Sequence, residues 1–463
     1  MNTTRTVRVE ASSHTSDTAI GTGARSAGDH IIAAVLALLA FLVYAWTDGS
    51  RIGQQSEQPH FVLLADALLH GHLWIDPARA ARLGDITPFA GHFYVSFPPM
   101  PAFLMLPFVA LVGPGFNDVI FTIVLGSLNV ALTYLLVRRL ARPGFAAPSG
   151  IPVYRRAAIA IAVLLGIGTV HFYATVAGTV WYTAHVVAVT FMLLYLIECA
   201  GRGRPLVAGT ALAAAFLART PTVLGGIFWL ACALRRDRSW RPLASRLVAF
   251  AAPSVLALIL LLGQNALRFG SPLDFGYFAM RIAPRLAPDR ARYGLFSLHF
   301  LPRNLAAFLI TPPIIGPIGP AVWLILSGNP FAFLGQLHLP ELSLLGLAFP
   351  LRFDPEGTGL WAVSPALLFA LRWPRARDTL LAAASWASTI LVALPDLLYY
   401  NTGWYQYGYR FSLDFTPFLL ILTALGLRRP LGIGWRALFI VLLIISVGSN
   451  FLGARWFLHL PPY

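Results

Sequence analysis

Long apolar segments alternate with arginine-rich turns along almost the whole chain, and this alternation constrains the fold more than any other feature. The chain is 57% hydrophobic and only 11% charged, whereas a soluble domain carries roughly 25% charged residues. A helix needs about 20 residues to cross the hydrocarbon core of a bilayer. We therefore expect an all-α polytopic membrane protein. Eleven segments are candidate spans: 31–46, 117–137, 156–174, 181–198, 205–219, 222–235, 246–267, 357–372, 379–398, 411–427 and 435–452.

The arginines decide how these segments are threaded. Segment 99–113 is also apolar, but it is short and begins with two prolines, which favours a helix at the interface or a re-entrant helix. If it does not cross, every arginine-rich turn falls on one side, as the positive-inside rule requires. We therefore predict about 11 transmembrane helices, with the N-terminus cytoplasmic and the C-terminus outside. The turns concerned are 138–156, 202–204, 235–246, 372–377 and 428–429.

The remaining parts of the chain divide simply. Residues 1–29 are rich in Ser, Thr and Gly and lack an apolar period, so we predict a disordered cytoplasmic tail. We expect residues 30–463 to form a single transmembrane domain with two long outer segments, 47–116 and 268–356. Each should carry a juxtamembrane amphipathic helix, the second near 299–311.

The charge and the cysteines exclude some partners. The net charge of +15 agrees with arginine-rich inner turns that contact lipid headgroups, so we predict no nucleic-acid partner. Cys199 and Cys232 form no CxxC pattern, which indicates neither a disulfide nor a thiol metal site.

The outer segment 47–116 concentrates the polar chemistry. It contains Glu57, four aspartates and four of the eleven histidines. A carboxylate near the membrane surface can act as a general base, although Glu57 can equally be an ordinary solvated carboxylate. His60, His70, His72 and His92 match no standard zinc spacing. Glu57 and Asp66 leave a divalent cation open, but we predict no metal and no cofactor.

Two arginines lie where an outer phosphate would be bound. Arg219 lies at the turn of a short apolar hairpin, and Arg410 opens a span among Trp404, Tyr407 and Tyr409. Each can clamp a phosphate through two N–H groups or simply extend its side chain to the interface. Arg410 has a further alternative, a helix-stabilising pair with Asp414, four residues on. Arg268 and Arg303 are weaker candidates in the second outer segment.

Several short motifs resemble those of GT-C type glycosyltransferases. Glu57-Gln-Pro-His-Phe-Val-Leu63, Asp66-Ala-Leu-Leu-His-Gly71 and Tyr94-Val-Ser-Phe-Pro-Pro99 are similar to three elements of their first outer loop. Asn265–Tyr277 resembles their Arg-Phe-Gly-Ser-Pro-Leu-x-Phe-Gly-Tyr stretch, and Tyr409-Arg-Phe411 resembles a late Arg-Tyr element. The relevant family is that of the dolichyl-phosphate-mannose protein mannosyltransferases and lipid A aminoarabinose transferases.

The resemblance implies a membrane glycosyltransferase that moves a sugar from a polyprenyl-phosphate donor to a lipid, glycan or protein acceptor, with inversion. It implies an active site on the outer face, in a bacterial cytoplasmic membrane. Glu57 would be the catalytic base. Residues expected to bind substrate are His60, Asp66, Arg219, Arg268, Arg303, Tyr409 and Arg410.

Two other classes of protein stay open. The family's Asp-Glu pair is Glu57-Gln58 in this chain, and the loss of one carboxylate is what a catalytically inactive scaffold would show. A lipid or solute carrier would instead place ionisable residues in the middle of its spans. Here they concentrate in the outer segments, which favours an enzyme at the interface.

Overall fold

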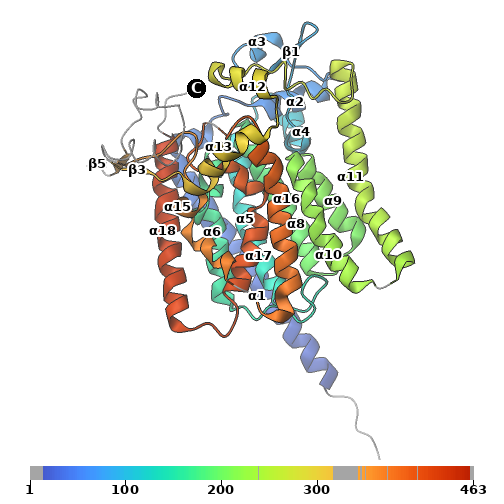
Figure 1. Cartoon of the computed structure of the whole chain (residues 1–463), viewed down its shortest axis with the longest axis vertical. Coiled ribbons are helices and arrows are strands. Elements are labelled where there is room, and N and C mark those ends of the chain that lie inside the picture. Colours follow the sequence, from blue (N-terminus) through green and yellow to red (C-terminus); the bar gives the residue numbers. More distant parts are fainter. Residues whose placement is uncertain are drawn as a thin grey trace, which may run out of the picture.

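The protein is a bundle of long helices, with smaller elements gathered at one end (Figure 1). The computed structural model describes residues 14–237, 239–315, 342–344, 347–349, 351–372, 374–403 and 405–458. The longest helices are α1 (His14–Asp48), α5 (Asp118–Leu140), α8 (Val180–Ala200), α11 (Trp240–Phe269), α16 (Thr379–Leu398) and α18 (Ile433–Leu458). Shorter helices are α2 (His60–Leu69), α3 (Pro77–Ala80), α4 (Met100–Val112), α6 (Arg155–Gly168), α7 (His171–Ala177), α9 (Pro205–Phe216), α10 (Ile227–Arg236), α12 (Ala287–Tyr293), α13 (Leu301–Leu305), α15 (Leu360–Val363) and α17 (Thr416–Gly426).

Tighter or irregular helical turns and short strands complete the chain. The helical turns are η1 (Gly49–Gly53), η2 (Thr220–Gly226), η3 (Pro284–Leu286), η4 (Leu298–Phe300), η5 (Ala306–Ile310), η7 (Pro365–Leu371), η8 (Ala376–Asp378) and η9 (Arg410–Asp414). The antiparallel strand pairs are β1 (Thr87–Phe89) with β2 (His92–Tyr94), β3 (Ile314–Ile315) with β6 (Leu351–Arg352), and β4 (Leu342–Leu344) with β5 (Leu347–Phe349). The all-α class expected from the sequence is confirmed.

Every segment predicted to span the membrane contains helix, but not all of these helices are long. In the described part of the chain six are long and apolar enough to cross, and a seventh crossing results if α6 and α7, bent by 50°, form one span. The other predicted spans consist of α9, of η2 with α10, of α15 with η7, and of η9 with α17. Prolines explain two of these breaks, Pro365 at the start of η7 and Pro417 in the first turn of α17, because proline disrupts the preceding helical turn.

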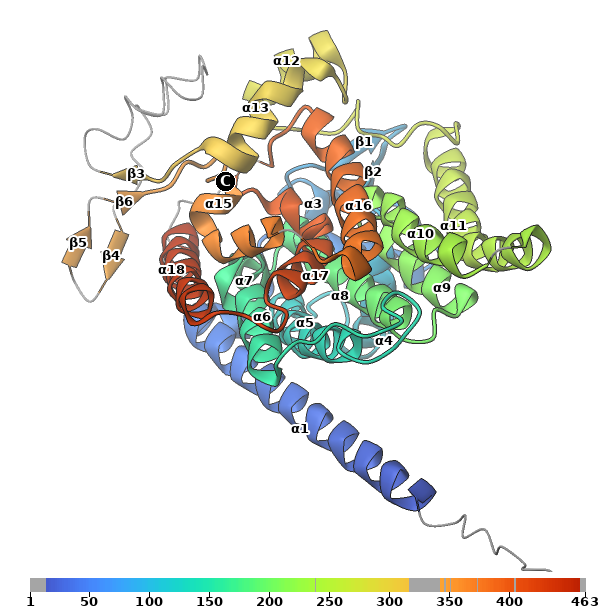
Figure 2. The same cartoon turned by 60° about the horizontal axis from the view of Figure 1, so that its bottom comes forward.

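The helices pack around α8, while α11 and α18 lie at opposite edges of the bundle (Figure 2). Most of α8 is buried, whereas most of α11 faces outward. The close approach of α9 to α11 depends on Gly209, because a Cβ atom there would lie 2.1 Å from the carbonyl oxygen of Phe250. Cys199 and Cys232 are buried free thiols.

The arginine-rich turns meet at one end of the bundle. The carboxylate of Asp29 in α1 accepts hydrogen bonds from Arg138 at 3.0 Å and from Arg142 at 2.9 Å. The amide of Arg429 donates to the carbonyl of Pro152. This gathering agrees with the predicted threading, in which α4, only 13 residues long, does not cross. The side of the membrane that this end faces stays a prediction.

The opposite end carries the two long outer segments. The first contributes η1, α2, α3, the β1–β2 hairpin and α4, and the second contributes α12 and α13 (Figure 1). The helix expected near 299–311 is present as η4, α13 and η5. The division into tail and membrane domain stays a prediction, and α1 begins at His14, inside the predicted tail.

Candidate functional site

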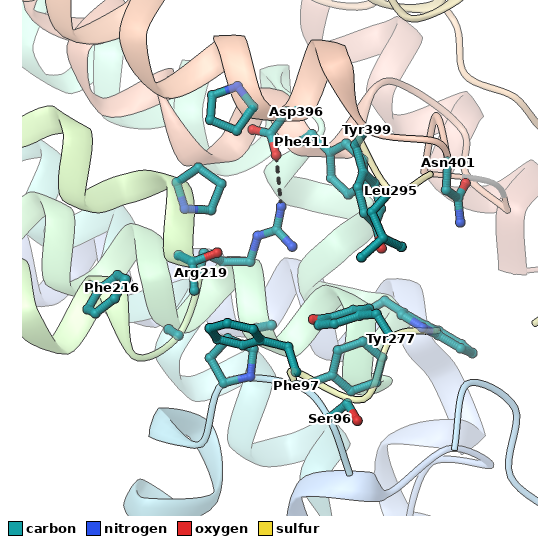
Figure 3. A pocket seen from close by; sticks show the side chains of 18 of the residues that line it. Ser96, Phe97, Phe216, Arg219, Tyr277, Leu295, Asp396, Tyr399, Asn401 and Phe411 are labelled. Atoms are coloured by element: carbon teal, nitrogen blue, oxygen red, sulfur yellow. Dashed lines mark hydrogen bonds and ion pairs between the residues drawn. The ribbon is translucent and has the colours of Figure 1, made fainter. Parts of the chain in front are cut away.

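A cavity of about 480 Å³ lies at the end of the bundle that carries the outer segments. Its walls come from the two outer segments, the start of α8, α9 with η2, and the last turns of α11. The end of α16, the residues that follow it and the start of η9 complete the walls. Figure 3 shows Arg219 reaching into it between Asp396 and Phe97. Three arginines and two aspartates line the cavity: Arg219, Arg268, Arg410, Asp85 and Asp396.

Arg268 is a buried cation without a carboxylate partner among the described residues. It is the second-last residue of α11, which ends at Phe269 before Gly270, a residue with the left-handed backbone that closes a helix. Its Nη1 donates to the carbonyl of Val95 at 2.8 Å and its Nη2 to Asn265 at 2.9 Å. The residue is only 5% exposed. Neutral acceptors hold the guanidinium in place and leave its charge uncompensated.

Arg410 is in a similar position. It is 5% exposed, it donates to the carbonyls of Gly403 and Tyr405, and its guanidinium lies 5.3 Å from the centroid of the Tyr182 ring. Its Nε is buried and finds no hydrogen-bond partner in the part of the chain that the structure describes. Among the described residues it forms no ion pair, so the alternative of an Arg410–Asp414 pair is not observed. Trp404, which the sequence placed beside it, lies outside the described residues.

Arg219 is paired instead. Its Nε and Nη2 each lie 2.9 Å from Oδ2 of Asp414, and its Nη2 lies 3.2 Å from Asp396. The second oxygen of Asp414 lies 2.8 Å from Nδ1 of His185 on α8. The guanidinium also lies 5.0 Å from the ring centroid of Phe411. Arg219 thus connects the turn before η2 to η9 and α16, and part of its surface faces the cavity.

Asp85 is the carboxylate that the first outer segment contributes to the cavity. It lies between α3 and β1 with φ +49°, an uncommon backbone conformation for a residue with a side chain. Its Oδ2 accepts a hydrogen bond of 2.8 Å from the indole of Trp181. Burial raises the pKa of Asp85 above its ordinary value, and the Trp181 hydrogen bond and the charges of Arg410 and Arg290 oppose this increase. A carboxylate with a raised pKa is suited to accept a proton near neutral pH.

One side of the cavity is apolar and reaches the surface of the bundle. Phe216 lies to one side of Arg219, and Asn401 lies to the other (Figure 3). The apolar side chains come from α9, η2 and α11: Phe216, Val223, Leu224, Leu258 and Leu261. Leu224 is 40% exposed and Leu258 is 43% exposed. In a bilayer these two side chains would face lipid, so the cavity combines a polar interior with access from the membrane.

The sequence predicted three of the residues that line the cavity, Arg219, Arg268 and Arg410. Its proposed base, Glu57, is instead exposed and does not line the cavity. Asp66 is half-buried beside His70, 3.7 Å away. Neither carboxylate lines this cavity, and the roles predicted for them stay predictions.

Three further predicted residues lie outside the cavity lining. His60 is fully buried behind the wall and contacts Gly84. Arg303 forms an ion pair with Asp289 at 2.8 Å. Tyr409 is buried between aromatic rings. A role of these residues in substrate binding stays a prediction, and their observed contacts support the surrounding structure.

Sequence reasoning missed two cavity-lining carboxylates. Asp85 is one of four aspartates in the first outer segment and follows a glycine, which marks a turn but not the side chain's direction. Asp396 follows Pro395 near the end of α16, where the sequence indicated only a helix end. Across the described residues, no three His, Cys, Asp or Glu side chains form a group that could hold a metal ion.

Comparison with known proteins adds a distant structural likeness. No family model matches the chain. No curated protein matches it either. The structure is similar to the crystal structure of ArnT from Cupriavidus metallidurans bound to undecaprenyl phosphate, with a TM-score of 0.44, 13% sequence identity, and coverage of 92% of this chain and 76% of that chain. A likeness this distant gives no residue a role and carries no argument about activity.

Proposed function

We propose that this protein is an integral membrane glycosyltransferase that moves a sugar from a polyprenyl-phosphate donor to an acceptor, with inversion. The observation that carries the proposal is the pair of buried guanidiniums, Arg268 and Arg410, which line one cavity without a carboxylate partner among the described residues. A buried charge is costly unless it is paired. An anionic ligand would supply the missing partner, and guanidiniums suit phosphate geometry.

The apolar side of the cavity supports a lipid-linked phosphate rather than a free one. An isoprenoid chain could leave between Leu224 and Leu258, whose side chains are exposed on the bundle surface. The phosphate would then lie against the arginines with the sugar beside Asp85. The motif resemblance supplies the polyprenyl class of donor, and the cavity supplies a place where such a molecule could bind.

The proposed chemistry is a single displacement. Asp85 accepts the proton of the acceptor hydroxyl, the hydroxyl oxygen attacks the anomeric carbon, and the bond from that carbon to the phosphate oxygen breaks. The leaving polyprenyl phosphate gains negative charge, which Arg268 and Arg410 stabilise as it develops. No covalent enzyme intermediate is formed, so the anomeric configuration inverts.

The proposal includes the setting of the reaction. The cavity opens at the end opposite the arginine-rich turns, which the positive-inside rule assigns to the cytoplasm. The reaction would thus occur at the outer face of a bacterial cytoplasmic membrane, with a lipid, glycan or protein as acceptor. We propose that it needs no metal, and a chelator tests that part.

The deciding experiment measures transfer from polyprenyl-phosphate sugars by purified protein. Asp85→Asn should lower turnover by about 10²–10⁴-fold, the usual contribution of general base catalysis, while donor binding survives. Glu57→Gln should keep near-normal turnover because Glu57 lies outside the cavity. The opposite pattern would return the role to Glu57. Donor binding without transfer under any condition would indicate an inactive scaffold, and strong inhibition by a chelator would refute metal independence.

A further inference from the structure

Gly84, the residue before Asp85, is held at both its N–H and its carbonyl by one short segment. The amide of Gly84 donates to Oε1 of Gln58 at 3.0 Å, and Nε2 of His60 lies 2.7 Å from the carbonyl oxygen of Gly84. His60 is the first residue of α2, and Gln58 lies two residues before it. Both lie more than twenty residues before Gly84 in the sequence. The sequence treated Gln58 as a lost carboxylate, but its amide oxygen has a defined structural use here.

His60 supports the cavity wall from behind. It is 0% exposed, and its ring centroid lies 5.9 Å from that of Phe97 and 6.3 Å from that of Trp181. Phe97, Trp181 and Asp85 all line the cavity. Burial lowers the pKa of His60, so the ring is neutral and carries one N–H. The other ring nitrogen, Nδ1, lies 3.2 Å from the carbonyl oxygen of Gln58. We assign the single N–H to Nε2, whose contact with the carbonyl of Gly84 is the shorter of the two.

Asp85 needs such support. Its φ of +49° is unfavourable for a residue with a Cβ atom, and such conformations persist when the surroundings over-determine them. The two contacts with Gly84 hold the backbone just before Asp85, and the indole of Trp181 holds the Asp85 carboxylate. The same residue, His60, contacts both Gly84 and the ring of Trp181.

We infer that Gln58 and His60 form a clamp that positions Asp85 as the base of the transfer reaction. This inference rests on the proposed function. Neither Gln58 nor His60 lines the cavity itself, so they act through Gly84 and Trp181 rather than on the substrate. Loosening the clamp should let Asp85 leave its strained conformation and turn its carboxylate away from the acceptor.

The test compares variants that remove each contact. Gln58→Met removes the acceptor at similar length, and His60→Phe removes the N–H donor but keeps a ring. Each should lower kcat by about tenfold or more, with the Kd for polyprenyl phosphate within about twofold of the wild type. Gln58→Glu and His60→Gln each retain one hydrogen-bonding group of the required kind, and should recover part of the loss.

Matched controls come from the same outer segment. Gln55 also donates to backbone carbonyls, those of Pro114 and Phe116, and His70 contacts the carbonyl of Asp66. Neither lines the cavity. Gln55→Met and His70→Phe should leave kcat within about twofold, even where Gln55→Met lowers the melting temperature. Equal losses of kcat in controls and clamp variants would overturn the inference.

A second readout follows the carboxylate itself. Modification of Asp85 by a hydrophobic carbodiimide, measured by peptide mass spectrometry across pH, reports its protonation without requiring turnover. The clamp variants should shift this profile, because they change the position of Asp85 relative to the groups that perturb its titration. Those groups are Arg410, Arg290, Trp181, Tyr277, Tyr399 and Tyr400.

The two readouts separate the possible failures. If the wild type transfers no sugar but the clamp variants shift Asp85 modification and the controls do not, the proposed function fails and the clamp stands as a structural device. If the wild type is active and the clamp variants match it in both kcat and Asp85 modification, the clamp is refuted. An unchanged modification profile with kcat and melting temperature falling together would show a role in folding only, and would also refute it.

Discussion

The Arg219 guanidinium contacts both carboxylate oxygens of Asp414, with Nε lying 2.9 Å from one and 3.2 Å from the other. The two residues are 195 positions apart, and Asp414 is fully buried. Asp414 also contacts His185, so the pair links the turn before η2 to η9 and α8. This ion pair holds together the elements that form the cavity.

Removing one partner of this pair should destabilise the protein. Arg219→Met leaves Asp414 as a buried charge without its cation, and breaking a buried ion pair costs about 3–5 kcal/mol. A large decrease in melting temperature of the purified protein in detergent is therefore expected. The double variant Arg219→Met/Asp414→Leu should recover part of it, because it removes the unpaired charge of Asp414 and leaves only Asp396 without its cation.

The control is an exposed pair. Arg204 and Glu198 are joined by a similar hydrogen bond, but Arg204 is exposed to solvent. Exposed ion pairs contribute little to stability, so Arg204→Met should leave the melting temperature almost unchanged. If Arg219→Met melts like the wild type, or if the double variant is no more stable than the single one, the structural role assigned to the pair is wrong.

The sequence predicted the arginines of the cavity because their positions follow from local patterns. Arg219 lies at a turn between apolar segments, Arg268 ends one and Arg410 begins one, so each had to lie near an interface. For all three to line one cavity, the outer ends of these helices had only to lie close together. That much of the site follows from hydrophobic periodicity and charge.

Partners separated widely in sequence could not be predicted in this way. The expected pairing of Arg410 with Asp414 assumed an α-helix, in which residues four apart lie on one face. Residues 410–414 instead form a 3₁₀ helix, where residues three apart are aligned. The carboxylate of Asp414 therefore pairs with Arg219 and not with Arg410. Asp85 was missed for a related reason, since Trp181, which fixes its direction, is 96 residues away.

Arg268 and Arg410 should bind the donor phosphate. Arg268→Gln and Arg410→Gln should each weaken binding of polyprenyl phosphate by about 10–100-fold, because a hydrogen bond to a charged group contributes about 1.5–3 kcal/mol. Arg410→Lys should also bind more weakly, since the ammonium cannot donate two parallel hydrogen bonds. Affinity can be measured by titration of detergent-solubilised protein with the lipid.

Stability distinguishes these arginines from Arg219. Because neither has a carboxylate partner in the described part of the chain, their replacement by glutamine should lower the melting temperature without ligand less than Arg219→Met does, through the lost hydrogen bonds to neutral acceptors alone. Arg303→Gln is the matched control for binding, since Arg303 contacts Asp289 outside the cavity. Unchanged affinity in both cavity variants would eliminate the proposed phosphate site.

Asp354 should make stability depend on pH. Burial and the neighbouring charge of Glu356 raise its pKa to about 7, and its Oδ2 has no hydrogen-bond partner among the described residues. A carboxyl with a raised folded-state pKa stabilises the protein in its neutral form, so this contribution is full below about pH 4 and is lost as the pH rises through about 7.

Asp354→Asn cannot ionise and keeps an oxygen that can accept from the amide of Glu356. The variant should therefore melt at a higher temperature than the wild type at pH 8, with the difference shrinking toward pH 5. Melting curves of both proteins across this range provide the measurement. A difference that is constant with pH would show that Asp354 does not titrate as proposed.

The threading of the chain can be tested at two exposed positions on either side of α5. Gly115 lies between α4 and α5, at the end with the outer segments, and Pro148 lies in the arginine-rich turn after α5. If α4 does not cross the membrane, cysteine at 115 should be labelled by an impermeant maleimide from outside, and cysteine at 148 only after permeabilisation. Cys199 and Cys232 are buried and can be replaced by alanine to remove background.

Labelling of both positions from the same side would contradict the predicted threading, because the 23 residues of α5 would then not cross. Labelling in the reverse order would keep α5 as a span but would place the cavity, and with it the proposed reaction, on the cytoplasmic side.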